Sequence, residues 1–255
     1  MSKNNLQTVI LSGGMGSRIS SETIDKPKPM IKIRNIPILV HIMNIYSSYG
    51  FNDFILCLGY KSEYIKNYFY NYYINNSDFE LNLNDSSINF LNKKNMDWKI
   101  TFVDTGINSN TGERIKRINK YIKNDNFMLT YGDGVGNINI KKLVDYHYNH
   151  KKIATLTAAR PPGRFGVLDI NKTGLVNSFK EKVNPNGYIN AGFFVLNKKI
   201  FKYLNKFKNP IWEQEPLENL ASSRQLMSYK HKGYWRPVDT TRDKEDLERE
   251  IIKIL

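Results

Sequence analysis

Short apolar segments alternate with segments of helical periodicity along the first 160 residues. Strands are predicted at residues 6–11, 53–58, 99–105, 126–131 and 153–158. Helices are predicted between them, at residues 38–49, 62–73, 112–122 and 139–150. This alternation is typical of βαβ units, in which the strands form a largely parallel sheet. The order of elements therefore predicts an α/β fold.

Local signals mark the ends of two of these helices. Pro37 suits the first turn of the helix at 38–49, and Gly50 stands where a C-terminal cap glycine is expected. Ser62 is the residue type preferred as the N-cap of the helix at 62–73. These signals indicate short, well-bounded elements.

The second half of the chain changes character. Strand-like segments are predicted at residues 165–170, 175–180, 188–196, 227–231 and 235–238, and helices at 198–207, 215–226 and 241–255. Residues 75–97 are polar and asparagine-rich with short alternating stretches, which indicates an inserted hairpin arm. No repeat or domain boundary is visible. We predict one domain over residues 1–255: a mostly parallel sheet with flanking helices, an inserted β arm and a small additional sheet in the later half.

Composition excludes several classes of protein. The chain is 40% hydrophobic and 24% charged, which is incompatible with a disordered or low-complexity polypeptide. Its one cysteine, Cys57, can form neither an intrachain disulfide nor a cysteine metal cage. No apolar run approaches the ~18–20 residues that span a bilayer, and the apolar stretch near the N-terminus is too short for a signal peptide. We therefore expect a cytoplasmic protein without a membrane partner.

The net charge of +14, from 38 basic and 24 acidic residues, could serve nucleic acid, an anionic membrane or small phosphorylated ligands. A basic nucleic-acid-binding protein without catalysis is therefore one interpretation. However, the positive residues form no block of five or six, and no RNA-binding or zinc-finger signature accompanies the aromatic residues. Most of the excess is expected to be solvated surface, so we predict no nucleic-acid partner.

A glycine-rich loop follows the first predicted strand. Gly13, Gly14 and Gly16 allow backbone amides to approach an anion, and the guanidinium of Arg18 suits phosphate oxygens. The loop is neither a Walker A loop nor a dinucleotide fingerprint, since Ile19 occupies the third glycine position. By itself it is equally compatible with an ordinary turn between a strand and a helix.

The segment 26–30, Lys-Pro-Lys-Pro-Met, is the second unusual stretch. Its prolines fix φ and favour an extended backbone before them, so Lys26 and Lys28 are expected on a stiff segment. A lysine held in this way can meet a fixed anion at low entropic cost. The alternative is a proline-rich surface turn with solvated lysines.

Two aspartates follow predicted strands. Asp133 lies between two glycines at the end of the strand at 126–131, where ligands bind in open α/β sheets. A carboxylate there is suited to Mg²⁺, although Asp-Gly also marks ordinary turns. Asp239 is a candidate second carboxylate, with an N-cap of the last helix as its alternative. His147 and His150 lie one turn apart without a visible third ligand, so a solvated helix face is expected.

Taken together, these motifs resemble the sugar-phosphate nucleotidyltransferases, and within them the cytidylyl branch. The N-terminal motifs of the family are matched by residues 9–18 (VILSGGMGSR) and 26–30 (KPKPM). Further matches are 58–60 (LGY), 103–106 (VDTG), 111–114 (TGER), 130–134 (TYGDG), 161–166 (PPGRFG), 181–182 (EK), 189–194 (INAGFF), 212–217 (WEQEPL) and 239–244 (DTTRDK). The similarity covers nearly the whole chain.

The resemblance implies a Rossmann-like core and an enzyme that converts CTP and α-D-glucose 1-phosphate to CDP-glucose and pyrophosphate. It also implies Mg²⁺ as cofactor and a homo-oligomer, a hexamer in the family. The nucleotide would be held by Leu11, Ser12, Gly13, Gly14, Met15, Gly16, Ser17 and Arg18, with Ser109, Arg114 and Gly132 at further nucleotide-contacting positions. The sugar phosphate would be bound by Glu181, Lys182 and Asn190, and Mg²⁺ by Asp133 and Asp239. Arg18, Lys28 and Asp133 would be the catalytic residues.

This chemistry agrees with what the residues can do. A sugar phosphate is already an anion at neutral pH, so it needs no general base, and the protein must supply alignment and cancellation of charge. Three positions depart from the family pattern, namely Ser12, Glu113 and Ala191, the last of them close to the expected sugar site. The same chemistry with another nucleotide or sugar 1-phosphate therefore stays open, as does a regulatory subunit without catalysis.

Overall fold

The computed structural model describes residues 5–16, 19–92, 96–160, 167–171, 173–180 and 187–253. The predicted site residues Ser17, Arg18, Glu181 and Lys182 lie outside these ranges.

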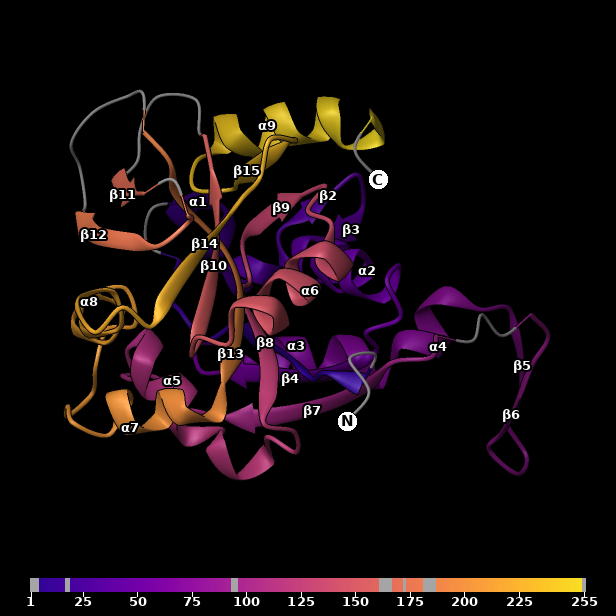
Figure 1. Ribbon diagram of the computed structural model, residues 1–255. Coiled ribbons are helices and arrows are strands. Elements are labelled where there is room, and N and C mark those ends of the chain that lie inside the picture. Colours follow the sequence, from indigo (N-terminus) through magenta and orange to yellow (C-terminus); the bar gives the residue numbers. More distant parts are fainter. Residues whose placement is uncertain are drawn as a thin grey trace.

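A seven-stranded sheet forms the centre of the fold (Figure 1). Its order is β14-β10-β13-β8-β1-β4-β7. The strands are β1 (Thr8–Leu11), β4 (Asp53–Leu58), β7 (Lys99–Asp104), β8 (Asn126–Tyr131), β10 (Ala154–Ala159), β13 (Ile189–Asn197) and β14 (Leu226–Lys230). β13 is antiparallel to both β8 and β10, and the other neighbouring pairs are parallel. The predicted mostly parallel α/β sheet is confirmed.

Helices lie on both faces of this sheet, with α2 and α6 on one face and α5 on the other. The helices of the described residues are α1 (Ser20–Thr23), α2 (Ile38–Ser47), α3 (Ser62–Tyr70), α4 (Tyr72–Asn76), α5 (Thr111–Arg117), α6 (Ile140–His150), α7 (Phe201–Leu204), α8 (Glu215–Ser222) and α9 (Thr241–Glu250). Single 3-10 turns are η3 (Lys28–Met30), η4 (Asn119–Tyr121), η5 (Lys198–Ile200) and η6 (Ile251–Lys253).

The core lies in two layers because successive residues of a strand point to opposite faces. Ile10 of β1 belongs to a buried cluster that includes Ile42 of α2 and Leu143 of α6. Its neighbour Val9 belongs to the other cluster, which includes Ile115 of α5. A parallel strand buried on both faces reads as an unbroken apolar run, which is what β1 shows.

Within the described ranges, four two-stranded sheets accompany the central one. They are β2 (Lys32–Ile33) with β3 (Ile36–Pro37), β5 (Phe79–Asn82) with β6 (Ser87–Phe90), β9 (Gly134–Gly136) with β15 (Trp235–Pro237), and β11 (Val167–Ile170) with β12 (Val176–Lys180). The β5–β6 hairpin projects far from the main body and is the predicted arm (Figure 1). The β11–β12 pair is a small additional sheet of the later half, as expected.

Several predicted helix ends were wrong. Lys61, with φ of +48°, precedes α3 without a side-chain cap, so Ser62 is the first residue of the helix and not its N-cap. Asn71 separates α3 from α4, where one helix was predicted. The helix predicted at 215–226 ends at Ser222, because Leu226 pairs with Ala154 at the start of β14. The helix predicted at 198–207 is reduced to η5 and α7.

The lysine–proline segment also differs from the prediction. Pro27 is extended, with φ of −71° and ψ of 151°, but the residues from Lys28 to Met30 form the turn η3. All three residues of this turn are buried. The turn directs Lys28 into the fold instead of leaving it on an extended surface segment.

The histidines of α6 do not form a solvated face, which corrects that expectation. His147 is 3% exposed, and its Nδ1 lies 2.8 Å from Thr155 Oγ1, whereas Nε2 of His150 lies 2.6 Å from the same oxygen. Burial lowers the pKa of His147 to about 3 and that of His150 to about 4. Both imidazoles are therefore neutral near pH 7, in a polar cluster in which His147 is buried and His150 partly buried.

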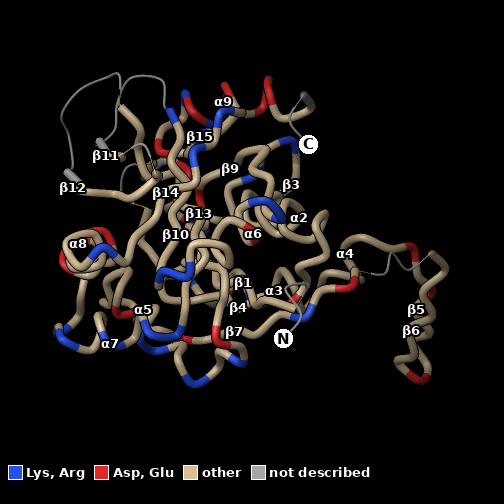
Figure 2. The backbone as a smooth tube through the Cα atoms, viewed as in Figure 1, with Lys and Arg blue, Asp and Glu red and all other residues tan. Residues whose placement is uncertain are grey.

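Figure 2 shows a concentration of positive residues around α5 and α7. Part of this charge is compensated locally, since Glu113 pairs with Lys116 at 3.0 Å and with Arg117 at 3.1 Å. Among the described residues, no helix is both long and apolar enough to cross a membrane.

Candidate active site

A cavity of about 1140 Å³ opens where β1 and β8 end side by side. The carboxyl ends of parallel strands are the usual ligand-binding edge of an α/β sheet. The predicted site residues that line it are Leu11, Ser12, Gly13, Gly14, Gly16, Lys28, Ser109, Arg114, Gly132, Asp133, Asn190 and Asp239. Met15 is 54% exposed and is not among its lining residues. Most of the described candidates, although far apart in the sequence, thus meet in one cavity.

The glycine-rich loop is attached to its neighbours through its backbone. The Ser12 amide donates to the carbonyl of Cys57, and the Gly13 carbonyl accepts from the Tyr60 amide. A Cβ on Gly13 would lie 2.9 Å from the Gly59 nitrogen, so a side chain cannot be accommodated there. Gly14, in contrast, is exposed with open space beside its Cα, which leaves room for a ligand at the loop backbone.

Lys28 lies between the two predicted metal-binding carboxylates. Its Nζ is 2.6 Å from Asp133 Oδ2 and 2.7 Å from Asp239 Oδ1. Burial disfavours the ammonium, but the charges of the two aspartates outweigh it and hold the pKa of Lys28 above its ordinary value. The lysine is therefore fully charged near pH 7 and only 8% exposed.

The β9–β15 ladder brings the two aspartates together. Asp133 immediately precedes β9, and its carbonyl accepts a hydrogen bond from the Val238 amide just beyond β15. Thr240, and not Asp239, caps α9, in a capping box with Asp243. The carboxylate of Asp239 is thus available to face Lys28.

This pair of carboxylates suits a cation whose other ligands are water molecules and substrate oxygens. Mg²⁺ is commonly held by one or two protein carboxylates, with water and substrate phosphates as the other ligands. Asp133 and Asp239 converge on one point, which fits that pattern. No group of three or more His, Cys, Asp or Glu ligands occurs in the part of the chain that the structure describes. The site is therefore compatible with a metal that binds together with a phosphorylated ligand.

Arg114 lies in the cavity wall, but its hydrogen bonds are made to the protein. The guanidinium is 4% exposed and donates to the backbone carbonyls of Gly13, Leu58, Gly106 and Ile107 and to Thr105 Oγ1. Burial lowers its pKa, although arginine stays charged. Arg114 therefore ties the glycine-rich loop to the end of β4 and to the loop after β7. Ser109 donates to the Thr105 carbonyl in the loop after β7.

Three further side chains in this cavity, those of Tyr131, Glu213 and Thr111, were not selected from the sequence, and they adjoin the predicted Asn190. Asn190 Nδ2 donates to the hydroxyl of Tyr131 at 3.2 Å, and that hydroxyl lies in the field of the Glu213 carboxylate. Thr111 Oγ1 donates to Glu213 Oε2 at 2.6 Å. Burial, together with the charge of Glu213, raises the pKa of Tyr131 well above its ordinary value. Tyr131 and Glu213 stand in two of the quoted motifs, TYGDG and WEQEPL, which were the available signals.

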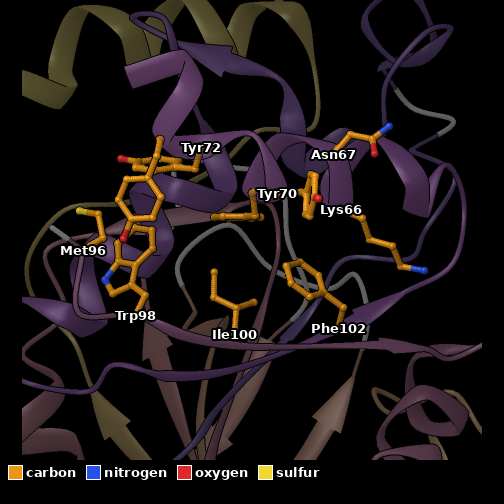
Figure 3. A pocket seen from close by; sticks show the side chains of 10 residues that line it. Lys66, Asn67, Tyr70, Tyr72, Met96, Trp98, Ile100 and Phe102 are labelled. Atoms are coloured by element: carbon orange, nitrogen blue, oxygen red, sulfur yellow. The ribbon is translucent and has the colours of Figure 1, made fainter. Parts of the chain in front are cut away.

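A smaller cavity of about 500 Å³ lies between α3, α4 and the edge strand β7 (Figure 3). It is lined by Lys66, Asn67, Phe69, Tyr70, Tyr72, Tyr73, Met96, Trp98, Ile100 and Phe102. Figure 3 shows Tyr72, Trp98, Ile100 and Phe102 around one hollow. The described residues that line it include no carboxylate and are mostly apolar and aromatic, so this cavity is not suited to charge-based chemistry on phosphates.

The larger cavity can therefore bind and align anions. It combines a buried ammonium, a carboxylate pair suited to a divalent cation and an exposed glycine backbone. Among its described lining residues there is no His or Cys. This arrangement is suited to direct transfer between phosphorylated substrates rather than to covalent catalysis through an imidazole or a thiol.

Comparisons with known proteins agree with this chemistry. A family model described as "Nucleotidyl transferase" matches residues 7–251. The chain is 49% identical over 245 residues to "Glucose-1-phosphate cytidylyltransferase" of Salmonella typhimurium strain LT2, with 95% of each chain covered. It is 44% identical to "Probable glucose-1-phosphate cytidylyltransferase" of Bacillus subtilis strain 168, with 92% of each covered. Among solved structures, HddC from Yersinia pseudotuberculosis complexed with GMP-PN is 25% identical, with a TM-score of 0.76 and coverage of 96% of this chain and 99% of that one.

Proposed function

The chain belongs to the nucleotidyl transferase family, and from that membership we propose that it makes CDP-glucose and pyrophosphate from CTP and α-D-glucose 1-phosphate. The observation that carries this choice is the 49% identity, over 95% of both chains, to a protein named glucose-1-phosphate cytidylyltransferase. The geometry of the larger cavity supports the same chemistry. We place the enzyme in the cytoplasm, where CTP is available.

In the proposed reaction, an oxygen of the sugar phosphate attacks the α-phosphorus of CTP. A new phosphorus–oxygen bond forms, the bond from the α-phosphorus to the bridging oxygen breaks, and pyrophosphate leaves with that electron pair. No proton has to be removed, because the attacking phosphate is already ionised. The protein therefore has to align two groups that repel each other and cancel their charge.

Lys28 is proposed to neutralise charge at the α-phosphate. Its position between two carboxylates keeps it protonated, and its burial keeps water from screening its field. Asp133 and Asp239 would hold Mg²⁺, which when bound offsets the charge of the triphosphate. Loss of one such contact is expected to lower the rate by about 10²–10³-fold, as for a lost oxyanion donor.

The remaining assignments follow the resemblance. The nucleotide is proposed to contact residues 11–18, Ser109 and Gly132, with Arg18 on its phosphates. The sugar phosphate is proposed to contact Glu181, Lys182 and Asn190. Arg114 is proposed to act from beneath the loop, because its donors already bind protein oxygens.

The test is pyrophosphate release with glucose 1-phosphate, Mg²⁺ and each of CTP, UTP, dTTP, ATP and GTP. We expect release with CTP alone, CDP-glucose as the second product by mass, and no release after Mg²⁺ is chelated. Release with another nucleotide only would contradict the cytidylyl assignment. If CTP fails with a panel of sugar 1-phosphates as well, the proposed reaction is wrong, and salt-sensitive binding to DNA or RNA would favour the nucleic-acid alternative.

A homo-oligomer is part of the proposal. The arm exposes apolar side chains at its tip and base, with Leu83 84% and Leu91 61% exposed, and the aromatic cavity of Figure 3 is a second apolar surface. Apolar surfaces of this kind are covered in stable assemblies. Light scattering should give a multiple of 29.7 kDa, and a lower mass for Leu83→Asp. A monomeric wild type would contradict this part of the proposal.

A further inference from the structure

Four polar side chains form a line along one wall of the larger cavity. Thr111 Oγ1 donates to Glu213 Oε2 at 2.6 Å, the charge of Glu213 acts on the hydroxyl of Tyr131, and that hydroxyl accepts from Asn190 Nδ2 at 3.2 Å. The Oδ1 of Asn190 accepts from the Gly192 amide at 2.9 Å. Both ends of the Asn190 amide are therefore engaged by the protein.

The Asn190 amide is oriented from both ends. Its Oδ1 accepts from the Gly192 amide, and its NH₂ donates to the Tyr131 hydroxyl. The negative charge of Glu213 favours an orientation of that hydroxyl with its proton toward the carboxylate and its lone pairs toward Asn190. The amide of Asn190 is thus held with its NH₂ toward Tyr131, whereas a free asparagine could present either end to a ligand.

Packing keeps the line rigid. The Tyr131 ring lies so close to Gly192 that a Cβ there would be 2.4 Å from Cδ2. The ring of Phe194 stacks edge-on between Tyr131, at a centroid distance of 5.8 Å, and Trp212, at 5.6 Å. Trp212 is fully buried and directly precedes Glu213, which fixes the backbone that carries the carboxylate.

The charge of this wall selects the part of a substrate that can lie against it. Residues 211–218 contribute Glu213, Glu215 and Glu218 to the cavity lining and contain no lysine or arginine. Carboxylates repel phosphates but accept hydrogen bonds from hydroxyl groups. The wall is therefore suited to the polyhydroxyl part of a sugar phosphate, with the phosphate elsewhere.

We propose that Tyr131 and Glu213 are positioning residues that fix the Asn190 amide, so that the cavity distinguishes sugars by the placement of their hydroxyl groups. The inference rests on the proposed function, since it requires a sugar 1-phosphate in this cavity. A fixed donor and a fixed acceptor reject an epimer because its displaced hydroxyl leaves a buried polar group without a partner.

The test compares Tyr131→Phe and Glu213→Gln with wild type. Tyr131→Phe removes the acceptor of the Asn190 amide, and Glu213→Gln removes the charge that orients the Tyr131 hydroxyl. We expect the KM for glucose 1-phosphate to rise about tenfold, the value for one hydrogen bond of about 1.4 kcal/mol, with the KM for CTP within about twofold. The preference for glucose 1-phosphate over galactose and mannose 1-phosphates should fall by a similar factor. Tyr203→Phe is the matched control and should change neither value, because the hydroxyl of Tyr203 is hydrogen-bonded to the exposed Ser223.

Two measurements separate the inference from the proposed function. Calorimetric binding of glucose 1-phosphate to enzyme loaded with a non-hydrolysable CTP analogue gives the same comparison without turnover. If wild type shows no turnover, the proposed reaction is contradicted. If the variants nevertheless weaken the binding of glucose 1-phosphate, the inference is still supported. Unchanged sugar binding and discrimination in both variants would overturn the inference. So would an equal rise in both KM values accompanied by a lower melting temperature, because that is the result of a merely structural role.

Discussion

Replacement of Lys28 by methionine isolates the charge at the centre of the site. Methionine keeps an unbranched stem of similar length but has no ammonium, so packing is largely retained. In wild type, Nζ of Lys28 lies 2.6 Å from Asp133 Oδ2 and 2.7 Å from Asp239 Oδ1. The variant therefore leaves two carboxylates facing each other without a counter-charge.

The expected cost follows from these distances. The two carboxylate oxygens can be no further apart than about twice either distance, and at about 5 Å two unit charges repel by about 3 kcal/mol at an effective dielectric constant near 20. The side chain of Asp133 is 29% exposed, so solvent screens part of this repulsion. We expect Lys28→Met to lower the free energy of unfolding by about 2–3 kcal/mol without divalent cations, toward the low end of what breaking a buried ion pair costs.

The assay is urea unfolding with and without Mg²⁺, together with pyrophosphate release. Mg²⁺ should restore much of the lost stability in Lys28→Met, since it can take the place between the carboxylates, and turnover should still fall by about 10²–10³-fold. Lys26→Met is the control, because Lys26 belongs to the same segment but makes only a partly exposed pair with Glu22 at 3.6 Å. If Lys28→Met unfolds at the wild-type urea concentration, or if Mg²⁺ stabilises it no more than wild type, the charge argument is refuted.

Three further variants test other parts of the fold. In Arg114→Lys, the ammonium cannot replace the planar guanidinium that donates to four backbone carbonyls. We expect the free energy of unfolding in urea to fall by about 3 kcal/mol and the KM for the nucleotide to rise. Equal stability would contradict the proposed position of Arg114 beneath the loop. Gly192→Ala combines φ of +80° with a Cβ 2.4 Å from the Tyr131 ring and should lose at least about 1–2 kcal/mol, whereas unchanged unfolding would show that the ring can move. In the folded state the pKa of His147 is about 3, so below pH 6.5 this histidine binds fewer protons in the folded protein than in the unfolded chain. The contribution of neutral His147 to stability should therefore be complete above pH 6.5, and the free energy of unfolding should fall by about 1 kcal/mol per pH unit below it. His147→Gln should flatten the acid limb of that profile, and an unaltered slope would exclude the histidine as its source.

Local patterns were sufficient to predict most of the sheet. The strands at 53–58 and 126–131 have the predicted bounds, because an apolar run between polar residues is decided within a few positions. Helix ends were predicted less well. Leu226 was assigned to a helix, but pairing with a strand some seventy residues earlier decided its conformation. Propensity cannot include a partner that is distant in sequence.

The same division applies to the candidate site. The glycine-rich loop, Asp133 and Asp239 could be selected from the sequence because each has a chemical character of its own at the end of an element. That Lys28 lies between two aspartates, 105 and 211 residues away, was decided only when the strands and the β9–β15 ladder were assembled. The hydrogen bonds of Arg114 and Tyr131 were decided in the same way, since they depend on which polar atoms surround each side chain in the fold. The sequence by itself determined the fold class and the kind of chemistry, because these depend on residue type and local order. The tertiary structure alone decided which charges and hydrogen bonds meet, because both act over only a few ångströms of space.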